Sequence, residues 1–310
     1  MTHRKKKKST EKKKKPADAM VLVISDGKAF LGTGLAFQMY ITEEKHRKAL
    51  EGKKIGMVFE GKEIDLPGYI FKITGGTDKY GFMHHPGVDG GELKSILLSS
   101  PPGIRFARYK VEKRGGGFKL VDLRGIARKK TVRGNVIGDK TRQINVVVVS
   151  RRGSRIKEMT KESILSDRIL SPLVEKIGYL IIKNGLHRVR FVSDGEVVRL
   201  QDKLAEAGVT EQFIKKLSID LGIGVIKRGK KLILNVIRPV LKCRGNTEFA
   251  KYVAKTLYEF YNELVAGKKD LGDEDKVIAE LVDKILDGAE KALKNELKVD
   301  FRFKIKEKAS

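Results

Sequence analysis

The stretch RKKTVRGNVIGDKTRQINVVVVS, residues 128–150, joins a group of cations to an apolar run and decides how the first half of the chain is read. Its second part, from residue 143, has four consecutive valines, which predict a β-strand buried on both faces. Its first part places four cations beside Gly134 with almost no acid to balance them: Arg128, Lys129, Lys130 and Arg133. This part is either a solvated basic loop or a phosphate-binding loop, and the remaining sequence has to distinguish the two.

Frequent Gly and Pro residues divide the region before this stretch into short apolar segments, which predict strands. One short helix is expected over residues 41–52, with Gly52 at its end. A hairpin is expected over residues 109–124, because three glycines at 115–117 separate two alternating arms. These patterns predict a small β-barrel-like or β-rich domain over residues 20–153. The other expected strands are MVLVIS, GMVF, YIFKIT and SILLS, at residues 20–25, 56–59, 69–74 and 95–99.

The second half has a different character, and we expect a linker over residues 154–163 followed by an α+β domain over residues 164–310. Apolar residues at helical spacing predict long helices. Alternating segments predict strands, and residues 224–240 read as a hairpin that turns at Arg228 and Gly229. The expected helices are residues 169–185, 248–267 and a segment through residues 277–293; the expected strands are residues 187–193 and 301–306.

The charge of the chain favours a polyanionic partner. Its 310 residues include 66 Lys and Arg against 39 Asp and Glu, a formal net charge of +27. A field of this sign attracts nucleic acid or an anionic membrane surface. No apolar run approaches the roughly 20 residues of a membrane-spanning helix, and no signal-peptide core follows the basic start, so we expect no membrane partner and a cytoplasmic location. Cys243 is the only cysteine, which excludes an internal disulfide and a cysteine zinc cluster.

The excess of cations is greatest in the first half. Residues 1–160 contain 36 Lys and Arg against 16 Asp and Glu, whereas residues 161–310 contain 30 against 23. Residues 1–19 form a basic arm that is too polar to fold alone, and we expect it to be disordered. The arm is either a solubilising tail, a segment that orders against phosphates, or a targeting signal.

Motifs for catalysis and cofactor binding are missing from the sequence. There is no GxxxxGK[ST] loop and no GxSxG elbow, and residues 30–37 hold only two glycines, which favours a hairpin turn over a dinucleotide site. His84 and His85 are adjacent and lack further local ligands, so we expect no metal. The sequence therefore predicts no enzyme and no cofactor. Carboxylates of the second half that an enzyme could use, but which are more simply solvated surface, are Glu175, Asp194, Glu196 and Asp220.

Two basic clusters among Gly-rich segments favour the phosphate-binding reading. Arginine binds two phosphate oxygens at once, and glycine lets backbone amides approach a ligand closely. RNA is favoured over DNA because this half has no recognition helix, and loops on a compact body suit folded RNA that is read by shape. The predicted RNA-binding residues are Arg105, Arg108, Lys110, Arg114, Arg128, Lys129, Lys130, Arg133 and Arg142.

Three segments carry a family resemblance: FEGKEIDLPGYIFKITGGTDKYGF, ILLSSPPGIRF and RKKTVRGNVIGDKTRQINVVVV. In this order they resemble ribosomal protein six of the small subunit, in its archaeal and eukaryotic type, over residues 21–153. The resemblance implies a structural ribosomal protein with a β-rich body, ribosomal RNA and neighbouring ribosomal proteins as partners, and no catalysis. It implies RNA contacts for Arg105, Arg108 and the Arg128–Arg133 segment, and turn-forming roles for Asp78 and Gly81. An archaeal source is expected.

The chain departs from the family pattern in several places. His84 and His85 occupy a turn where the family has an arginine, and the hairpin over residues 109–124 looks inserted. Residues 164–310 have no counterpart in the resemblance, so a second hypothesis remains open. In it the protein is a ribosome-assembly or RNA-processing factor that uses its first domain as an RNA anchor. Presence once per mature small subunit would distinguish a resident protein from such a factor.

Overall fold

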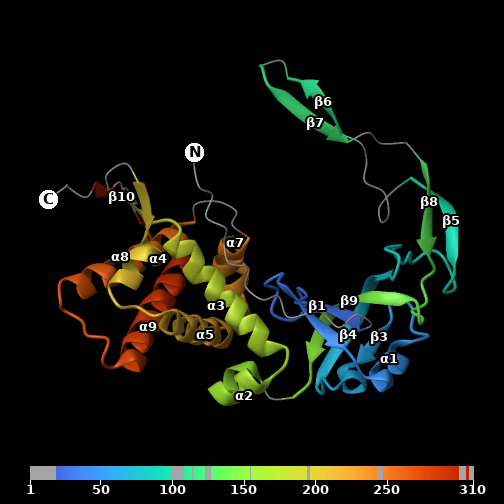
Figure 1. Ribbon diagram of the computed structural model, residues 1–310, viewed down its shortest axis with the longest axis horizontal. Helices are drawn as coiled ribbons and strands as arrows, with labels where there is room; N and C mark the ends of the chain where they lie inside the picture. Colours follow the sequence, from blue (N-terminus) through green and yellow to red (C-terminus); the bar gives the residue numbers. More distant parts are fainter. Residues whose placement is uncertain are drawn as a thin grey trace, which may run out of the picture. The chain divides into compact units, whose positions relative to one another are not determined.

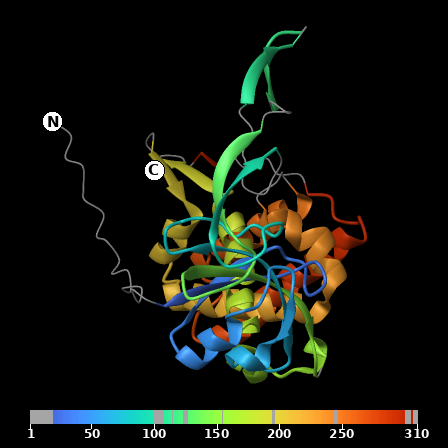
Figure 2. The same cartoon turned by 90° about the vertical axis from the view of Figure 1, so that its right-hand side faces the viewer.

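The computed structural model describes residues 19–99, 108–113, 115–122, 127–153, 155–193, 196–242, 247–299 and 305–306 (Figures 1 and 2). Contacts within the chain divide it into two compact units. Unit 1 comprises Met1–Ile24 and Gln38–Val147, and unit 2 comprises Ser25–Phe37 and Val148–Ser310. The division falls a few residues before the linker expected at residues 154–163, and a short early segment belongs to unit 2.

A five-stranded sheet with the strand order β2-β1-β9-β4-β3 is the centre of the β-rich region. Side chains on one face of these strands are fully buried, among them Leu22, Phe71 and Ile144. The sheet is open in the described residues, because β2 and β3 are its edges, so the expected barrel-like closure is not found. The strands are β1 Met20–Ser25, β2 Ala36–Ile41, β3 Val58–Glu60, β4 Tyr69–Asp78 and β9 Thr141–Arg151.

The valine-rich segment forms strand β9, which confirms the predicted strand, and β9 lies in the middle of the sheet. Val146 and Val148 are fully buried, whereas Val147 and Val149 are partly accessible. The burial therefore alternates along the strand and does not extend equally to both faces. The short helix expected after β2 is α1, Glu44–Leu50, and a 3₁₀ turn, Gly61–Ile64, precedes β4.

Two further ribbons belong to unit 1. In the first, β5 (Leu93–Leu98) pairs antiparallel with β8 (Arg128–Arg133), and the ribbon extends away from the five-stranded sheet (Figures 1 and 2). In the second, β6 (Arg108–Glu112) pairs antiparallel with β7 (Phe118–Asp122). The second ribbon confirms the hairpin that the three glycines predict.

Unit 2 is mostly helical. Its long helices begin at threonine caps where the sequence provides them: Thr210 accepts a hydrogen bond from the Phe213 amide, and Thr247 accepts one from the Ala250 amide. The helices bury aromatic residues between them, and the Phe213 and Phe260 rings stack with centroids 6.0 Å apart. The main helices are α2 Lys161–Ser166, α3 Leu170–Leu186, α4 Leu200–Glu206, α5 Glu211–Arg228, α8 Glu248–Val265 and α9 Glu274–Leu293.

A small sheet accompanies these helices, in the order β11-β10-β12. Strand β10 (Arg190–Ser193) pairs antiparallel with β11 (Glu196–Arg199) and parallel with β12 (Ile305–Lys306). The α3, α8 and α9 helices and the strand β10 confirm the elements predicted there. Of the strand expected over residues 301–306, the structure describes only the last two residues.

The hairpin expected over residues 224–240 is wrong. Helix α5 continues to Arg228, Gly229 interrupts it with a φ of 105°, and a second helical run follows. This run consists of α6 (Lys230–Leu232), a π-helical segment (Ile233–Ile237) and α7 (Arg238–Leu241). Short apolar runs do not separate strand from buried helix by periodicity, and here the run is buried among helices. None of the described helices is long and apolar enough to cross a membrane.

The segment Ser25–Phe37 links β1 to β2 through a hydrogen-bonded turn. The Asp26 carboxylate is buried and accepts hydrogen bonds from the amides of Leu31, Gly32 and Thr33 and from the Thr33 hydroxyl. The segment belongs to unit 2, and within that unit the Lys176 ammonium donates to the Ala36 carbonyl at 2.7 Å. Residues 30–37 thus form the hairpin turn that the two glycines favour.

Candidate nucleic-acid interface

Three predicted phosphate-binding cations lie on the β5–β8 ribbon. Arg128, Lys129 and Lys130 are exposed, and none of their side chains has a hydrogen-bond or ion-pair partner in the part of the chain that the structure describes. The segment was expected to be a loop, but it is a strand, whose side chains alternate between two faces. Arg128 and Lys130 therefore share one face, and Lys129 lies on the other.

One face of this ribbon packs in a small hydrophobic cluster. Val132 on β8 and Leu98 on β5, which lies opposite Arg128, are buried together with Val88, and Ile96 packs against them. The other face is open to solvent, since Leu97, opposite Lys129, is 71% exposed. The exposed cations thus stand on a ribbon that apolar contacts fix along one face.

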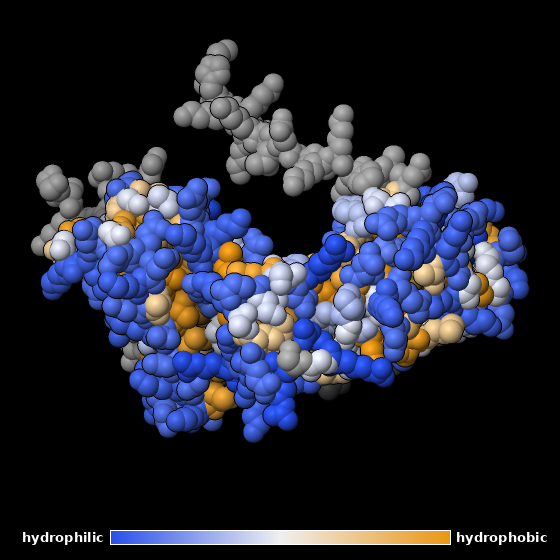
Figure 3. Space-filling model, turned by 90° about the horizontal axis from the view of Figure 1, so that it is seen from below, coloured by the Kyte–Doolittle hydropathy of each residue, from blue (hydrophilic) through white to orange (hydrophobic). Residues whose placement is uncertain are grey.

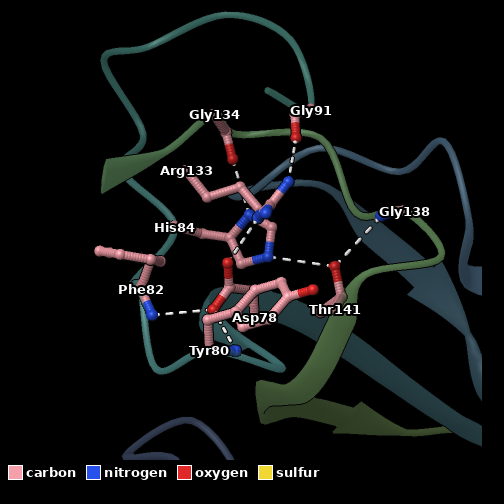
Figure 4. A network of polar contacts seen from close by, with 9 residues as sticks. All are labelled: Asp78, Tyr80, Phe82, His84, Gly91, Arg133, Gly134, Gly138 and Thr141. Carbon is pink, nitrogen blue, oxygen red and sulfur yellow. Dashed lines mark hydrogen bonds and ion pairs between the residues drawn. The ribbon is translucent and has the colours of Figure 1, made fainter. Parts of the chain in front are cut away.

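Arg133, the fourth predicted cation of the segment, is placed differently. Its side chain is buried: Nε donates to the Asp78 carboxylate at 2.9 Å, and Nη1 donates to the Gly91 carbonyl at 2.7 Å (Figure 4). The other carboxylate oxygen of Asp78 accepts from the amides of Tyr80 and Phe82. The ion pair therefore ties the end of β8 to the turn after β4. The turn-forming role that the resemblance implies for Asp78 is confirmed.

His84 extends this network (Figure 4). Its Nδ1 lies 2.6 Å from the Gly134 carbonyl, which can only accept, so Nδ1 carries a proton. Its Nε2 lies 3.1 Å from the Thr141 hydroxyl, and that oxygen accepts from the Gly138 amide at 3.1 Å. Burial lowers the pKa of His84 from its ordinary value of 6.5, and the charge of Arg133 lowers it further, against the opposing effect of the backbone hydrogen bond. The neutral imidazole is thus the form that links β8 to β9.

Gly134 and Asn135 complete the anchoring of the segment. A Cβ atom at Gly134 would overlap the Gly90 carbonyl oxygen, so only glycine fits there. The Asn135 amide group donates to the Asp89 carboxylate at 3.0 Å, and its backbone amide donates to the Val88 carbonyl at 2.7 Å. The sequence Arg133-Gly134-Asn135 therefore positions the ribbon and is itself inaccessible to a ligand.

The remaining predicted cations are scattered. Arg108 and Lys110 lie on β6, where the strand register pairs them with Asp122 and Leu120. Arg142 is half-buried in β9. Arg105 and Arg114 lie outside the described residues. Among the predicted cations that the structure describes, Arg128, Lys129 and Lys130 are the ones it shows as exposed neighbours on one strand.

One group in unit 1 has the composition of a metal site. Ligand atoms of Glu43, His46 and Asp65 lie within 4.8 Å of one another. The imidazole already lies between the two carboxylates, 3.6 Å from Glu43 and 3.1 Å from Asp65, and both carboxylates are exposed. This arrangement is that of a histidine held by two acids, and it identifies no ion.

Comparison with known proteins matches residues 20–161 to the family Ribosomal protein S6e. The small ribosomal subunit protein eS6 of Methanocaldococcus jannaschii is 39% identical over 137 residues, which are 44% of this chain and 87% of that one. The protein of the same name from Archaeoglobus fulgidus is 37% identical over 142 residues, 46% of this chain and 95% of that one. The chain belongs to the ribosomal protein S6e family, and its last part, residues 162–310, has no family match.

A longer relative gives a different proportion. The protein eS6 of Hyperthermus butylicus is 40% identical over 114 residues, which are 37% of this chain but only 45% of that one. The matched region is therefore less than half of both chains. This relative, like the present protein, therefore has more sequence outside the matched region than within it.

The anchoring residues are the part of the site that sequence reasoning missed. Asp78 and Arg133 are 55 positions apart, and His84 and Thr141 are 57 apart. No local pattern pairs residues at such distances. The only signal was the position of Asp78 in a Gly-rich turn, which indicated a turn but not its charged partner.

Proposed function

We propose that this protein is a structural constituent of the small ribosomal subunit that binds ribosomal RNA with the basic side chains of unit 1. Neighbouring ribosomal proteins are further partners, the place of action is the ribosome in the cytoplasm, and the role is architectural and not catalytic. Family membership supports the ribosomal assignment. The observation that carries the RNA contact is the exposed triplet Arg128, Lys129 and Lys130, which has no acidic partner within the described residues.

The mechanism follows from the charge and the anchoring of the ribbon. Cations that meet backbone phosphates release condensed counterions, and this release supplies binding free energy that falls as salt rises. The Arg133–Asp78 pair and the His84 network hold the base of the ribbon, so the exposed cations are presented in a fixed arrangement. Arg128 and Lys130 lie on one face of β8, and Lys129 lies on the other. This arrangement suits a strand that is inserted into RNA with phosphates on both of its sides.

Arg133 has a different role in this proposal from the one its sequence context suggested. It holds the ribbon and does not contact phosphate, because its guanidinium is already bonded to Asp78 and Gly91. Arg105, Arg108, Lys110, Arg114 and Arg142 remain proposed contacts on the strength of their charge and of the resemblance alone.

The salt dependence of binding tests the proposal. The affinity of the chain for small-subunit ribosomal RNA is measured at several salt concentrations for the natural protein and for a triple variant with Arg128→Ala, Lys129→Ala and Lys130→Ala. The slope of log affinity against log salt is expected to become shallower by about 2 to 3, which corresponds to three lost phosphate contacts at roughly 0.7–0.9 each. An unchanged slope removes these residues from the interface.

A matched control keeps the change in net charge the same. Lys276, Lys284 and Lys291 are exposed on α9 of unit 2, and their joint replacement by alanine also removes three charges. This control should lower the affinity slightly at all salt concentrations while leaving the slope nearly as in the natural protein. Equal effects of both triple variants would mean that net charge alone governs binding.

The stoichiometry of the protein in salt-washed small subunits tests the residence that the proposal requires. Mass spectrometry against known subunit proteins should give a ratio near one. A ratio far below one would favour the assembly or processing factor, with unit 1 as its RNA anchor and unit 2 as its active part.

A further inference from the structure

Unit 2 contains a groove of about 680 Å³ along the seam between α3 and α5. Ligand pockets in proteins typically measure about 300–1,000 Å³, so the groove can hold a small molecule or one building block of a polymer. Except for Phe37, its lining residues lie in the part of the chain beyond the family match, and Phe37 comes from the Ser25–Phe37 segment of the same unit. Nothing in the family assignment accounts for it.

Glycines at the seam explain why a groove forms there. A Cβ atom at Gly178 would overlap the Ser218 carbonyl oxygen, and one at Gly222 would overlap the Val174 carbonyl oxygen. The two helix backbones therefore touch. Ser218, Tyr179 and Ile214 all line the groove, and Ser218 has the smallest side chain of the three.

Tyr179 offers an aromatic surface at this groove. It is 50% exposed, which is unusual for a large ring on a helix whose other face is buried. The Lys183 ammonium lies 5.5 Å from its ring centroid. Exposed aromatic rings beside cations are the surfaces on which the bases of single-stranded nucleic acids stack. On the molecular face shown in Figure 3 hydrophilic residues predominate.

The polar side chains around the groove have unused hydrogen-bonding capacity. Within the described residues, Glu175, Gln201, Glu211 and Lys215 form no hydrogen bond and no ion pair. Glu175, Glu211 and Lys215 are exposed, so water solvates them in the free protein. Ionised carboxylates accept only, so a ligand that replaces this water at Glu175 or Glu211 would donate N–H or O–H groups. The Lys215 ammonium would meet an anionic group of the ligand. The site therefore fits a ligand that carries a flat ring, ring-edge donors and a negative group at once.

A nucleotide is the ligand class that combines these three properties. A simple anion would leave the aromatic ring of Tyr179 unused. We propose that the groove of unit 2 binds a single nucleotide, with the base on Tyr179, base N–H groups on Glu175 or Glu211, and the phosphate near Lys215. The source of the nucleotide is either a free mononucleotide or an unpaired residue of RNA.

The absence of tryptophan from the chain gives a direct assay. The variant Tyr179→Trp places a single indole at the groove, and its fluorescence is followed while guanosine, adenosine, cytidine or uridine monophosphate is added. Saturable quenching is expected, with purines quenching at the lowest concentrations because they stack over the largest area. Ribose 5-phosphate is the phosphate-only probe and should not quench.

Two controls make the assay specific. The variant Val265→Trp places the indole on α8, at a residue that is 64% exposed and does not line the groove, and it should show no saturable quenching. In the natural chain, calorimetric affinity for the best monophosphate should fall roughly 5- to 150-fold in Tyr179→Ala, which is the range for loss of one stacked base. Tyr179→Phe keeps the ring and should retain the affinity.

Each outcome of these experiments either supports the nucleotide site or overturns it. Quenching by ribose 5-phosphate equal to that by nucleotides, no quenching by any monophosphate, or unchanged affinity in Tyr179→Ala would each overturn the inference. A short single-stranded RNA that binds more tightly than its monomer, and loses this advantage on duplex formation, identifies RNA as the source. Equal or weaker binding of the RNA identifies a free nucleotide. The assay uses no ribosomal RNA, so it can fail while the function proposed for unit 1 holds.

Discussion

The Arg133 guanidinium and the Asp78 carboxylate form a buried ion pair, in which Nε lies 2.9 Å from Oδ2 and neither side chain exceeds 5% exposure. The pair joins the end of β8 to the turn after β4. It is the reason why one cation of a basic segment is unavailable to a ligand while three others are exposed. The same basic segment thus contains both the proposed contact residues and a residue that supports them.

Replacing Arg133 with methionine should destabilise unit 1 strongly. The change leaves the Asp78 carboxylate buried without its cation, and breaking a buried pair in this way costs about 3–5 kcal/mol. Hydrogen exchange at the Val132 amide under native conditions reports the loss locally, which matters because a two-unit chain need not unfold in a single step. The double variant with Asp78→Asn should recover part of the loss. Native-like protection in Arg133→Met alone would contradict the anchoring role.

The stability of unit 1 should fall as the pH decreases below neutrality. Because the pKa of His84 is lowered in the folded protein, the unfolded chain binds the proton first, and stability is complete above about pH 6.5 and is lost as the pH falls towards the folded pKa. Proton NMR should show His84 staying neutral below pH 6.5. In the variant His84→Gln, the pH dependence of the stability around β8 should disappear. An ordinary titration near pH 6.5 would rule out this linkage.

Gly134 and Gly138 form a matched pair for a packing test. Gly134→Ala should cost several kcal/mol, because its Cβ would overlap the Gly90 carbonyl oxygen. At Gly138 a Cβ meets nothing within 4 Å, so Gly138→Ala should change the free energy of unfolding by no more than about 0.5 kcal/mol. Chemical denaturation of both variants, with exchange at β8 as the local probe, measures the difference. Similar stabilities of the two variants would be incompatible with the packing described.

Gly178 offers the corresponding test in unit 2. Gly178→Ala forces α3 away from the Ser218 backbone of α5, so we expect a loss of several kcal/mol despite the better helix propensity of alanine. The loss should appear as faster exchange in α3 and α5 while β9 keeps its protection. A more stable variant would mean that propensity outweighs packing at this seam.

The sequence predicted elements well where a local pattern is strong. The four valines of β9, the three-glycine hairpin and the amphipathic helices α8 and α9 all follow from composition and period. It failed at Ile233–Ile237, where a short buried apolar run suits strand and helix equally. The sequence also could not show that the expected barrel-like domain would form an open sheet, because closure of a sheet depends on which strands lie at its edges.

The candidate site was predicted in part for a related reason. Charge and glycine content located the segment that includes Lys129, but its alternation as a strand decides which cations share a face. Whether a given arginine is exposed depends on a distant acid, as Arg133 and Asp78 show. Such pairings are set by tertiary structure, and one sequence contains no sign of them.

The turn Ser25–Phe37 has a consequence for how the chain is made and divided. The polypeptide leaves unit 1 after Ile24, forms part of unit 2 up to Phe37, and re-enters unit 1 at Gln38. From Val148 onward it belongs to unit 2. A stop codon after Val147 would therefore keep every residue of unit 1 but would separate the Ser25–Phe37 segment from the rest of unit 2, including Lys176, which donates to Ala36 in the complete protein. During synthesis this turn emerges among the first residues and must wait for more than a hundred others before its partners exist.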